Sequence, residues 1–370
     1  MGKKKFVNPD NEKQSVEIEE CKLDKKLEDF DSRNNRIPEV DEFYVDLGMQ
    51  YRLAQVMNSK SKSFKNEIPI HIALMGHMGT GKDHDIEQFA AKLRFPYYRI
   101  PLSGEVRDVT LLGSVQLYGD GKGGTESRWQ DGELTRALRG PAIVNLSELN
   151  AAGPEVLFAL HSLLDRHRKL ELPNGEVLSL REDTYIFGTM NPTSLRDYAG
   201  TQSLNKAFAD RWVIWDKPFP NNEQLDAIFE KRYPKLQKEY RELIIKLATE
   251  INNSFMSDDI SINIETPMSL RTIVERIPIG LDVYVDSADP LKDTWENFVL
   301  PHVNKEDLDH YKTLWNTIVR KGPSVKPKLL NILLKGYLCL FFFCTFETLD
   351  TLRLIDPSNI LFQKTRLIRK

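Results

Sequence analysis

The sequence is poor in cysteine and has no excess of charge of either sign. Its three cysteines, Cys21, Cys339 and Cys344, are too few and too scattered for a disulfide framework, and none forms the C-x-x-C pair that would favour a zinc site. We therefore expect free thiols in a reducing cytoplasm. The 51 basic and 54 acidic residues leave a formal net charge of -3, which gives no general attraction to nucleic acid or to an anionic membrane.

The sequence also lacks a stretch suited to a secretory signal or a membrane span. The first residues, Met1-Gly-Lys-Lys-Lys-Phe6, are followed by acidic and polar residues and not by an apolar segment. The most apolar stretch, residues 329–346, is shorter than the roughly 20 residues of a spanning helix and contains Lys335. We expect these residues to be buried or covered by a partner, with membrane association or a non-native tail as the alternatives.

What the sequence does contain is an alternation of strand and helix patterns. A chain of 370 residues is long enough for one large and one small domain. Short apolar runs separated by helical segments predict an α/β fold with a parallel central sheet. The predicted strands cover residues 68–75, 97–102, 142–146, 184–190 and 212–215.

Four regions are predicted from changes in composition. Residues 1–42 are charged and polar, and we expect a solvated or disordered arm. Residues 43–220 form the α/β core, in which residues 114–129 and 169–180 are hairpin-like inserts, the second with an Asn174-Gly175 turn. Residues 221–322 have a helical pattern and predict a smaller α-helical domain, and residues 323–370 form a hydrophobic tail of unclear role.

A glycine-rich turn follows the first predicted strand directly and opens a helix. Its glycines would let backbone N–H groups converge on phosphate oxygens, and the helix N-terminus favours an anion. The lysine would reach the terminal phosphates of a nucleotide. The alternative is a tight turn with a solvated lysine. The turn reads Gly76-His-Met-Gly79-Thr80-Gly81-Lys82-Asp83.

A second strand end carries a hydroxyl and a carboxylate. The run Ile143-Val-Asn-Leu-Ser147-Glu148 ends where the strands of a parallel sheet face the ligand crevice. Glu148 is placed to polarise a water that attacks the γ-phosphate. Alternatively, it caps the helix that begins near Pro154.

Taken together, residues 68–277 resemble the MoxR branch of the AAA+ ATPases, which includes the CbbQ and NorQ type of dynein-related AAA domain. Each matching motif is weak alone, but their order over about 200 residues is specific. The motifs are the glycine-rich loop, residues 111–117, 129–138, 148–150 and 155–164, the Asn174-Gly175 hairpin, Gly188-Thr-Met-Asn-Pro192 and Ala207-Phe-Ala-Asp-Arg-Trp212.

The resemblance implies roles for three further residues. Asn191 is the sensor that orients the attacking water, and Arg211 is the arginine finger supplied to the nucleotide of a neighbouring subunit. Arg271, in Thr266-Pro-Met-Ser-Leu-Arg271, is the lid arginine that contacts the nucleotide of its own subunit. The alternatives are an ion pair of Arg211 with Asp210 and an ordinary surface arginine at position 271. The two inserts correspond to hairpins that this branch presents to the central pore and to substrate, or are plain surface hairpins.

The chain departs from the family at the magnesium site. The residue after the loop lysine, normally Ser or Thr, is Asp83, and the residue before the catalytic glutamate, normally Asp, is Ser147. In the family fold these side chains face each other, so the pair keeps one carboxylate and one hydroxyl. Mg²⁺ prefers such oxygen ligands. We expect Asp83 to bind the metal with help from Ser147; the alternative is two losses in a protein that binds nucleotide without turning it over.

The sequence therefore predicts an ATP- and Mg²⁺-dependent AAA+ protein that forms a homo-oligomeric ring, hexameric by resemblance, and remodels a client protein. A partner with a von Willebrand A domain would be a separate chain. The alternative is a structural or regulatory ring with little or no hydrolysis. A nucleic-acid motor is disfavoured by the near-neutral charge.

Overall fold

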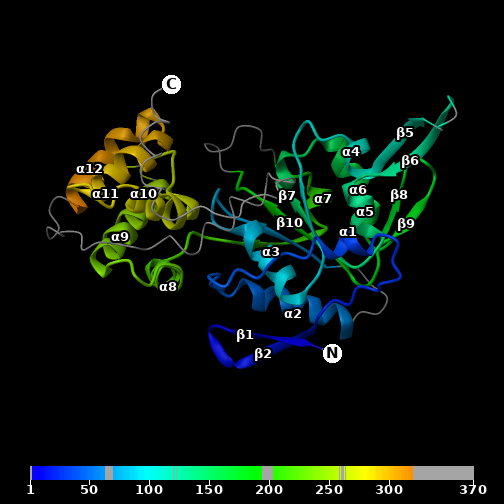
Figure 1. Ribbon diagram of the computed structural model, residues 1–370, viewed down its shortest axis with the longest axis horizontal. Helices are drawn as coiled ribbons and strands as arrows, with labels where there is room; N and C mark the ends of the chain where they lie inside the picture. The colour runs from blue at the N-terminus through cyan, green and yellow to red at the C-terminus, as the bar shows by residue number, and fades with distance from the viewer. Residues whose placement is uncertain are drawn as a thin grey trace, which may run out of the picture.

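The computed structural model describes residues 2–62, 70–119, 121, 123–193, 203–257, 259, 262 and 264–319. An α/β part occupies the right of Figure 1, and a helical part with α8 to α12 occupies the left. The predicted tail, residues 323–370, lies outside the described residues.

A parallel sheet forms the centre of the α/β part, which confirms the predicted fold class. The strand order is β11-β3-β10-β7-β4, with every neighbouring pair parallel. Because β3, β10 and β7 are consecutive in this order, the loops after their carboxyl ends meet at one edge of the sheet. The strands are β3 (His71–Met75), β4 (Tyr97–Pro101), β7 (Ala142–Ser147), β10 (Thr184–Met190) and β11 (Trp212–Asp216), each within a few residues of its prediction.

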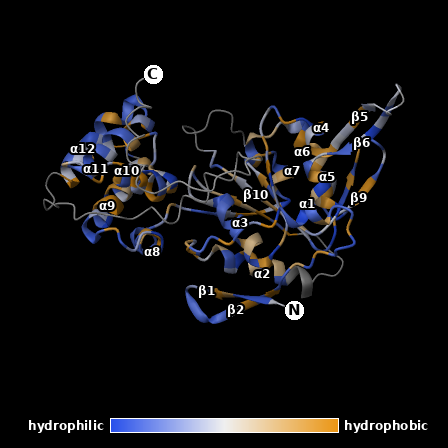
Figure 2. Ribbon diagram, viewed as in Figure 1, coloured by the Kyte–Doolittle hydropathy of each residue, from blue (hydrophilic) through white to orange (hydrophobic). Residues whose placement is uncertain are grey.

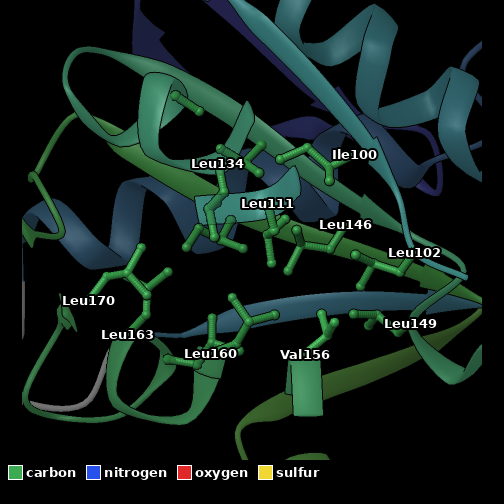
Figure 3. Close-up of a cluster of buried hydrophobic side chains, with 14 of the residues drawn as sticks. Ile100, Leu102, Leu111, Leu134, Leu146, Leu149, Val156, Leu160, Leu163 and Leu170 are labelled. Atoms are coloured by element: carbon green, nitrogen blue, oxygen red, sulfur yellow. The ribbon is translucent and has the colours of Figure 1, made fainter. Parts of the chain in front are cut away.

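Both faces of the sheet are covered, as the continuous apolar character of its strands requires. Along β7, Ile143 packs with α2 (Met49–Lys62) and α3 (Lys82–Leu93), whereas Val144 and Leu146 point to the opposite cluster. Figure 3 shows that opposite cluster, where Leu146 lies among leucines of the other covering helices. Those helices are α4 (Asp108–Leu112), α5 (Glu133–Leu138) and α6 (Pro154–Leu164).

The N-terminal region is ordered, which corrects the expected solvated or disordered arm over residues 1–42. It contains an antiparallel hairpin of β1 (Lys3–Asn8) and β2 (Asn11–Glu19), followed by α1 (Phe30–Asn34). Phe6 and Ile18 are buried beside α2 and α3, and the Phe6 ring lies 5.3 Å from that of Phe89. Sparse apolar residues at alternate positions are sufficient for a two-stranded ribbon when an existing core covers one face.

Both predicted hairpin inserts are present in the α/β part. The first pairs β5 (Gly113–Gly119) with β6 (Thr125–Asp131), and it projects from the body of the molecule at the upper right of Figure 1. The second pairs β8 (Lys169–Glu171) with β9 (Val177–Ser179). Gly175 in its turn has a φ of 84°, a left-handed conformation that glycine adopts without strain.

The helical part has its own apolar core and follows β11. Leu225, Ile244, Trp295 and Trp315 belong to one buried cluster there, and Figure 2 shows largely hydrophilic colours on α8 and α12. The helices are α8 (Asn222–Arg232), α9 (Lys238–Phe255), a π-helical turn (Thr272–Arg276) continued by α10 (Ile277–Val283), α11 (Pro290–Thr294) continued by a second π-helical turn (Trp295–Val299), 3-10 turns (Leu300–His302 and Lys305–Asp307) and α12 (Leu308–Ile318). The α/β part also contains α7 (Lys206–Ala209) and a 3-10 turn (Leu149–Ala151).

Candidate nucleotide-binding site

The glycine-rich loop connects β3 to α3 in the conformation that its sequence requires. Gly79 and Gly81 have φ values of 74° and 86°, which side-chain-bearing residues rarely adopt. A Cβ at Gly76 would lie 2.3 Å from the carbonyl oxygen of Lys217. Thr80 is buried, and its hydroxyl donates to the carbonyl of His77 at 3.0 Å. The loop therefore holds a tight arc whose end is the N-terminus of the 12-residue helix α3.

Lys82 lies inside this arc and reaches Asn191, the residue that follows strand β10. Its Nζ donates to the carbonyls of Gly76 at 2.6 Å and His77 at 2.9 Å, and to Oδ1 of Asn191 at 3.1 Å. Burial lowers the pKa of the Lys82 ammonium to about 8, although the carboxylates of Asp83 and Glu148 act in the opposite direction. The structure thus brings together the predicted lysine and the predicted sensor Asn191.

Asp83 is at the centre of a polar cluster built from three strands. Its Oδ1 accepts from Nδ2 of Asn145 at 2.9 Å and from the Thr189 hydroxyl at 2.8 Å. Its Oδ2 accepts from Nε and Nη2 of Arg99 at 3.2 and 2.9 Å. Burial raises the pKa of the Asp83 carboxyl, but the hydrogen bonds from Asn145 and Thr189 and the charge of Arg99 outweigh it, so the pKa lies below its ordinary value.

Ser147 faces Asp83, as the sequence predicts, at the end of β7. Its Oγ lies 3.2 Å from both carboxylate oxygens of Asp83. The next residue, Glu148, is exposed and has a φ of 63°. A non-glycine residue in the left-handed region is uncommon, and such positions cluster at functional sites. Glu148 precedes the 3-10 turn Leu149–Ala151 and does not cap α6, whose N-terminal cap is Gly153.

The helical part approaches the loop directly. The backbone N–H of Leu270 donates to the carbonyl of Gly79 at 2.9 Å, and a Cβ at Gly79 would lie 2.4 Å from that of Ser269. The exposed Arg271 lines a cleft of about 490 Å³ together with Gly81, Lys82, Asp83 and Arg99. Arg271 therefore lies on the cleft that the loop borders, and its predicted contact with nucleotide stays a prediction.

Arg211 lies apart from this cleft, between α7 and β11. Its Nε donates to the carbonyl of His161 at 3.3 Å, and Nη1 donates to the carbonyl of Ala207. Its Nη2 is 3.9 Å from the carboxylate of Asp165. Arg211 therefore forms its ion pair with Asp165 and not with Asp210. The Arg211 side chain is 24% exposed, and its predicted contact with a neighbouring subunit stays a prediction.

Sequence reasoning missed three residues of the Asp83 cluster: Arg99, Asn145 and Thr189. Asn145 and Thr189 are buried polar residues inside apolar strands, and such residues need partners. The polar Asn145 within the apolar run Ile143-Val-Asn-Leu-Ser147 could therefore have indicated a buried polar cluster. Arg99 gave no comparable signal, because a charged residue is ordinary on the edge strand β4.

A buried ion pair lies beneath the loop. Nζ of Lys217 is 2.5 Å from Oδ2 of Asp85, and both side chains are buried. The hydroxyl of Tyr44 donates to Oδ1 of Asp85 at 2.8 Å. These contacts tie α3 to the chain just after β11, at the start of the connection to the helical part.

In the part of the chain that the structure describes, no three His, Cys, Asp or Glu side chains cluster as a metal site would require. No helix within it is long and apolar enough to cross a membrane.

The sequence is similar to a known domain family and to known proteins. Residues 71–212 match the model of the AAA domain of the dynein-related subfamily. The aerobic cobaltochelatase subunit CobS of Sinorhizobium is 29% identical over 214 residues, which cover 55% of this chain and 63% of that protein. An uncharacterized protein of Staphylococcus epidermidis is 26% identical over 207 residues, covering 55% of this chain and 76% of its own length. The chain thus spans less than two thirds of the cobaltochelatase subunit.

The crystal structure of an inferred ATPase from Cytophaga hutchinsonii aligns with a TM-score of 0.38 and 17% identity, covering 80% of this chain and 93% of that one.

Proposed function

The chain carries an AAA domain of the dynein-related subfamily, and on this premise we propose that it binds ATP in the cleft beside Lys82 and works as one subunit of a ring that remodels a client protein. The observation that carries the proposal is the loop itself. The loop brings together two left-handed glycines, a helix N-terminus and the ammonium of Lys82, which contacts Asn191. The helical part contacts the same loop through Leu270. This combination suits the phosphates of a nucleotide.

Each predicted site residue then has a distinct task. Lys82 neutralises the terminal phosphates, and Glu148 accepts a proton from the water that attacks the γ-phosphorus, releasing ADP and phosphate. Asn191 orients that water through its side-chain amide. Arg271 contacts the nucleotide from the helical part, and Arg211 reaches the nucleotide of the neighbouring subunit, where it stabilises negative charge in the transition state.

The proposed client-facing surface is the first hairpin insert. Val115 and Leu117 on β5 are 59% and 75% exposed, although both are apolar. Exposed apolar side chains on a projecting hairpin are suited to contact with another protein. Following the resemblance to the MoxR branch of the AAA+ ATPases, we propose that the chain acts in the cytoplasm on a protein client, with a von Willebrand A partner on a separate chain and without nucleic acid.

The expected magnesium ligands do not fit a metal ion as the side chains stand. Asp83 already accepts hydrogen bonds from Arg99, Asn145 and Thr189, so its oxygens are occupied by protein donors. This observation favours a second candidate function: a structural or regulatory ring that binds nucleotide and hydrolyses it slowly or not at all.

The test is ATP binding by calorimetry together with steady-state phosphate release. Lys82→Ala should abolish ATP binding, because backbone amides alone do not replace the lost cation. The matched control is Lys246→Ala, at an exposed position on α9 away from the cleft. Undiminished affinity in Lys82→Ala would contradict the nucleotide site. Binding without phosphate release would favour the regulatory ring over the remodelling ATPase.

A further inference from the structure

We propose that the guanidinium of Arg99 takes the place of the divalent metal ion, so that this chain binds ATP without Mg²⁺. The inference rests on the proposed nucleotide binding and specifies the cation used at that site. It assigns a phosphate-binding role to a residue of β4 that neither the sequence motifs nor the family resemblance singled out.

The first step is the acceptor capacity of the Asp83 carboxylate. An ionised carboxylate offers about four lone-pair positions. In Asp83, Oδ1 accepts from Asn145 and Thr189, Oδ2 accepts twice from Arg99, and the Ser147 hydroxyl approaches both oxygens. The three neutral donors, Asn145, Ser147 and Thr189, are almost completely buried. If the Asp83 carboxylate turned away to bind a metal, each donor would lose a hydrogen-bond partner that water could not replace. The cluster is therefore a complete structure in itself.

The second step is the position of the guanidinium. Nη2 of Arg99 lies 2.9 Å from Oδ2 of Asp83 and 3.3 Å from Oγ of Ser147. These are the two residues whose oxygens would ligate Mg²⁺ at about 2.1 Å. A metal held by both would lie against a guanidinium that does not lose its charge in proteins. The same two residues therefore hold either the arginine or the metal.

The third step is the direction that Arg99 faces. Its side chain is 49% exposed and lines the cleft of about 490 Å³ with Gly79, Gly81 and Lys82. While Nε and Nη2 bind Asp83, Nη1 has no hydrogen-bond partner among the residues that the structure describes. A planar guanidinium held by a carboxylate on one edge presents its other edge to a phosphate, a group that arginine recognises well.

The two departures from the family pattern, Asp83 and Ser147, agree with this position of Arg99. With Asp83 on α3, the carboxylate lies where the family has a hydroxyl, and Arg99, in the middle of β4, pairs with it. The β4–β7 register places Arg99 opposite Asn145, which donates to the same carboxylate. The exchange at positions 83 and 147 thus creates a binding site for the Arg99 guanidinium in place of the metal site of the family.

The experiment measures ATP affinity by calorimetry in Mg²⁺ and in EDTA. The wild-type protein should bind ATP in EDTA, and Mg²⁺ should not improve its affinity. Arg99→Gln should weaken binding in EDTA about 10- to 100-fold, the range for a charge-assisted hydrogen bond. Because Asp83 is then released, Mg²⁺ should now improve binding to this variant. Arg107→Gln, an exposed arginine away from the cluster, is the control and should behave as wild type.

Three results would overturn the inference. ATP binding by the wild type that is lost in EDTA would mean that Arg99 gives way to a metal at Asp83, and the proposed function would survive. Unchanged affinity in Arg99→Gln would remove the arginine from the site. Absence of ATP binding in both buffers would instead refute the proposed function, and this inference with it. As a second readout, the electron paramagnetic resonance spectrum of Mn²⁺–ATP should change when the Arg99→Gln protein is added. It should not change when the wild-type protein is added.

Discussion

The partly buried ammonium of Lys82 should make ATP binding depend on pH between pH 7 and pH 9. Burial lowers its pKa to about 8 in the free protein, whereas an exposed lysine titrates near 10.4. The negative phosphates of a bound nucleotide favour the charged ammonium and raise this pKa again. As the pH rises through 8, the free protein loses the proton, and binding must restore it. The affinity for ATP should therefore fall with rising pH.

The magnitude follows from the pKa. With a value of about 8, roughly 90% of the protein carries a charged Lys82 at pH 7, about half at pH 8 and about 10% at pH 9. Affinity should be about tenfold weaker at pH 9 than at pH 7, and each ATP bound at pH 9 should bring about 0.9 proton onto the protein.

The assay is calorimetry at pH 9 in two buffers that differ in ionisation enthalpy. Proton uptake appears as a difference between the two buffers in the observed heat of binding. The ratio of the ATP affinities at pH 7 and pH 9 gives a second estimate of the pKa of Lys82. Lys82→Arg is the control, because its guanidinium remains charged throughout this range and its binding should be independent of pH and buffer. Equal heats in both buffers for the wild type would refute a Lys82 that is largely deprotonated in the free protein at pH 9.

Two further predictions concern assembly and stability. Arg211→Ala should leave ATP affinity nearly unchanged while abolishing phosphate release, and wild-type turnover per subunit should rise with protein concentration; full turnover by dilute monomers would contradict the role between subunits. Lys217→Met should lower the free energy of unfolding by about 3–5 kcal/mol, because it leaves Asp85 buried without its cation. Adding Asp85→Leu should recover most of this loss in denaturant titrations, and a single variant within about 0.5 kcal/mol of wild type would argue against a buried pair.

Much of the fold could be read from the sequence because its signals are local. Buried parallel strands are short apolar runs, and the turn after Met75 contains the glycines that its left-handed positions require. Predictions failed where a segment depends on a distant core. The β1–β2 hairpin has mostly charged and polar residues, and Phe6 and Ile18 are ordered only because α2 and α3 cover them.

The sequence by itself determined the α/β alternation, the two hairpins and the glycine-rich loop with Lys82, because each depends on neighbours along the chain. The resemblance to the MoxR branch also implied that Asp83 and Ser147 face each other. Only the tertiary structure decided what surrounds that pair. Arg99, Asn145 and Thr189 come from three different strands, and parallel packing brings their side chains to one carboxylate. No spacing in the sequence encodes that convergence, since it depends on the order and register in which the strands pair.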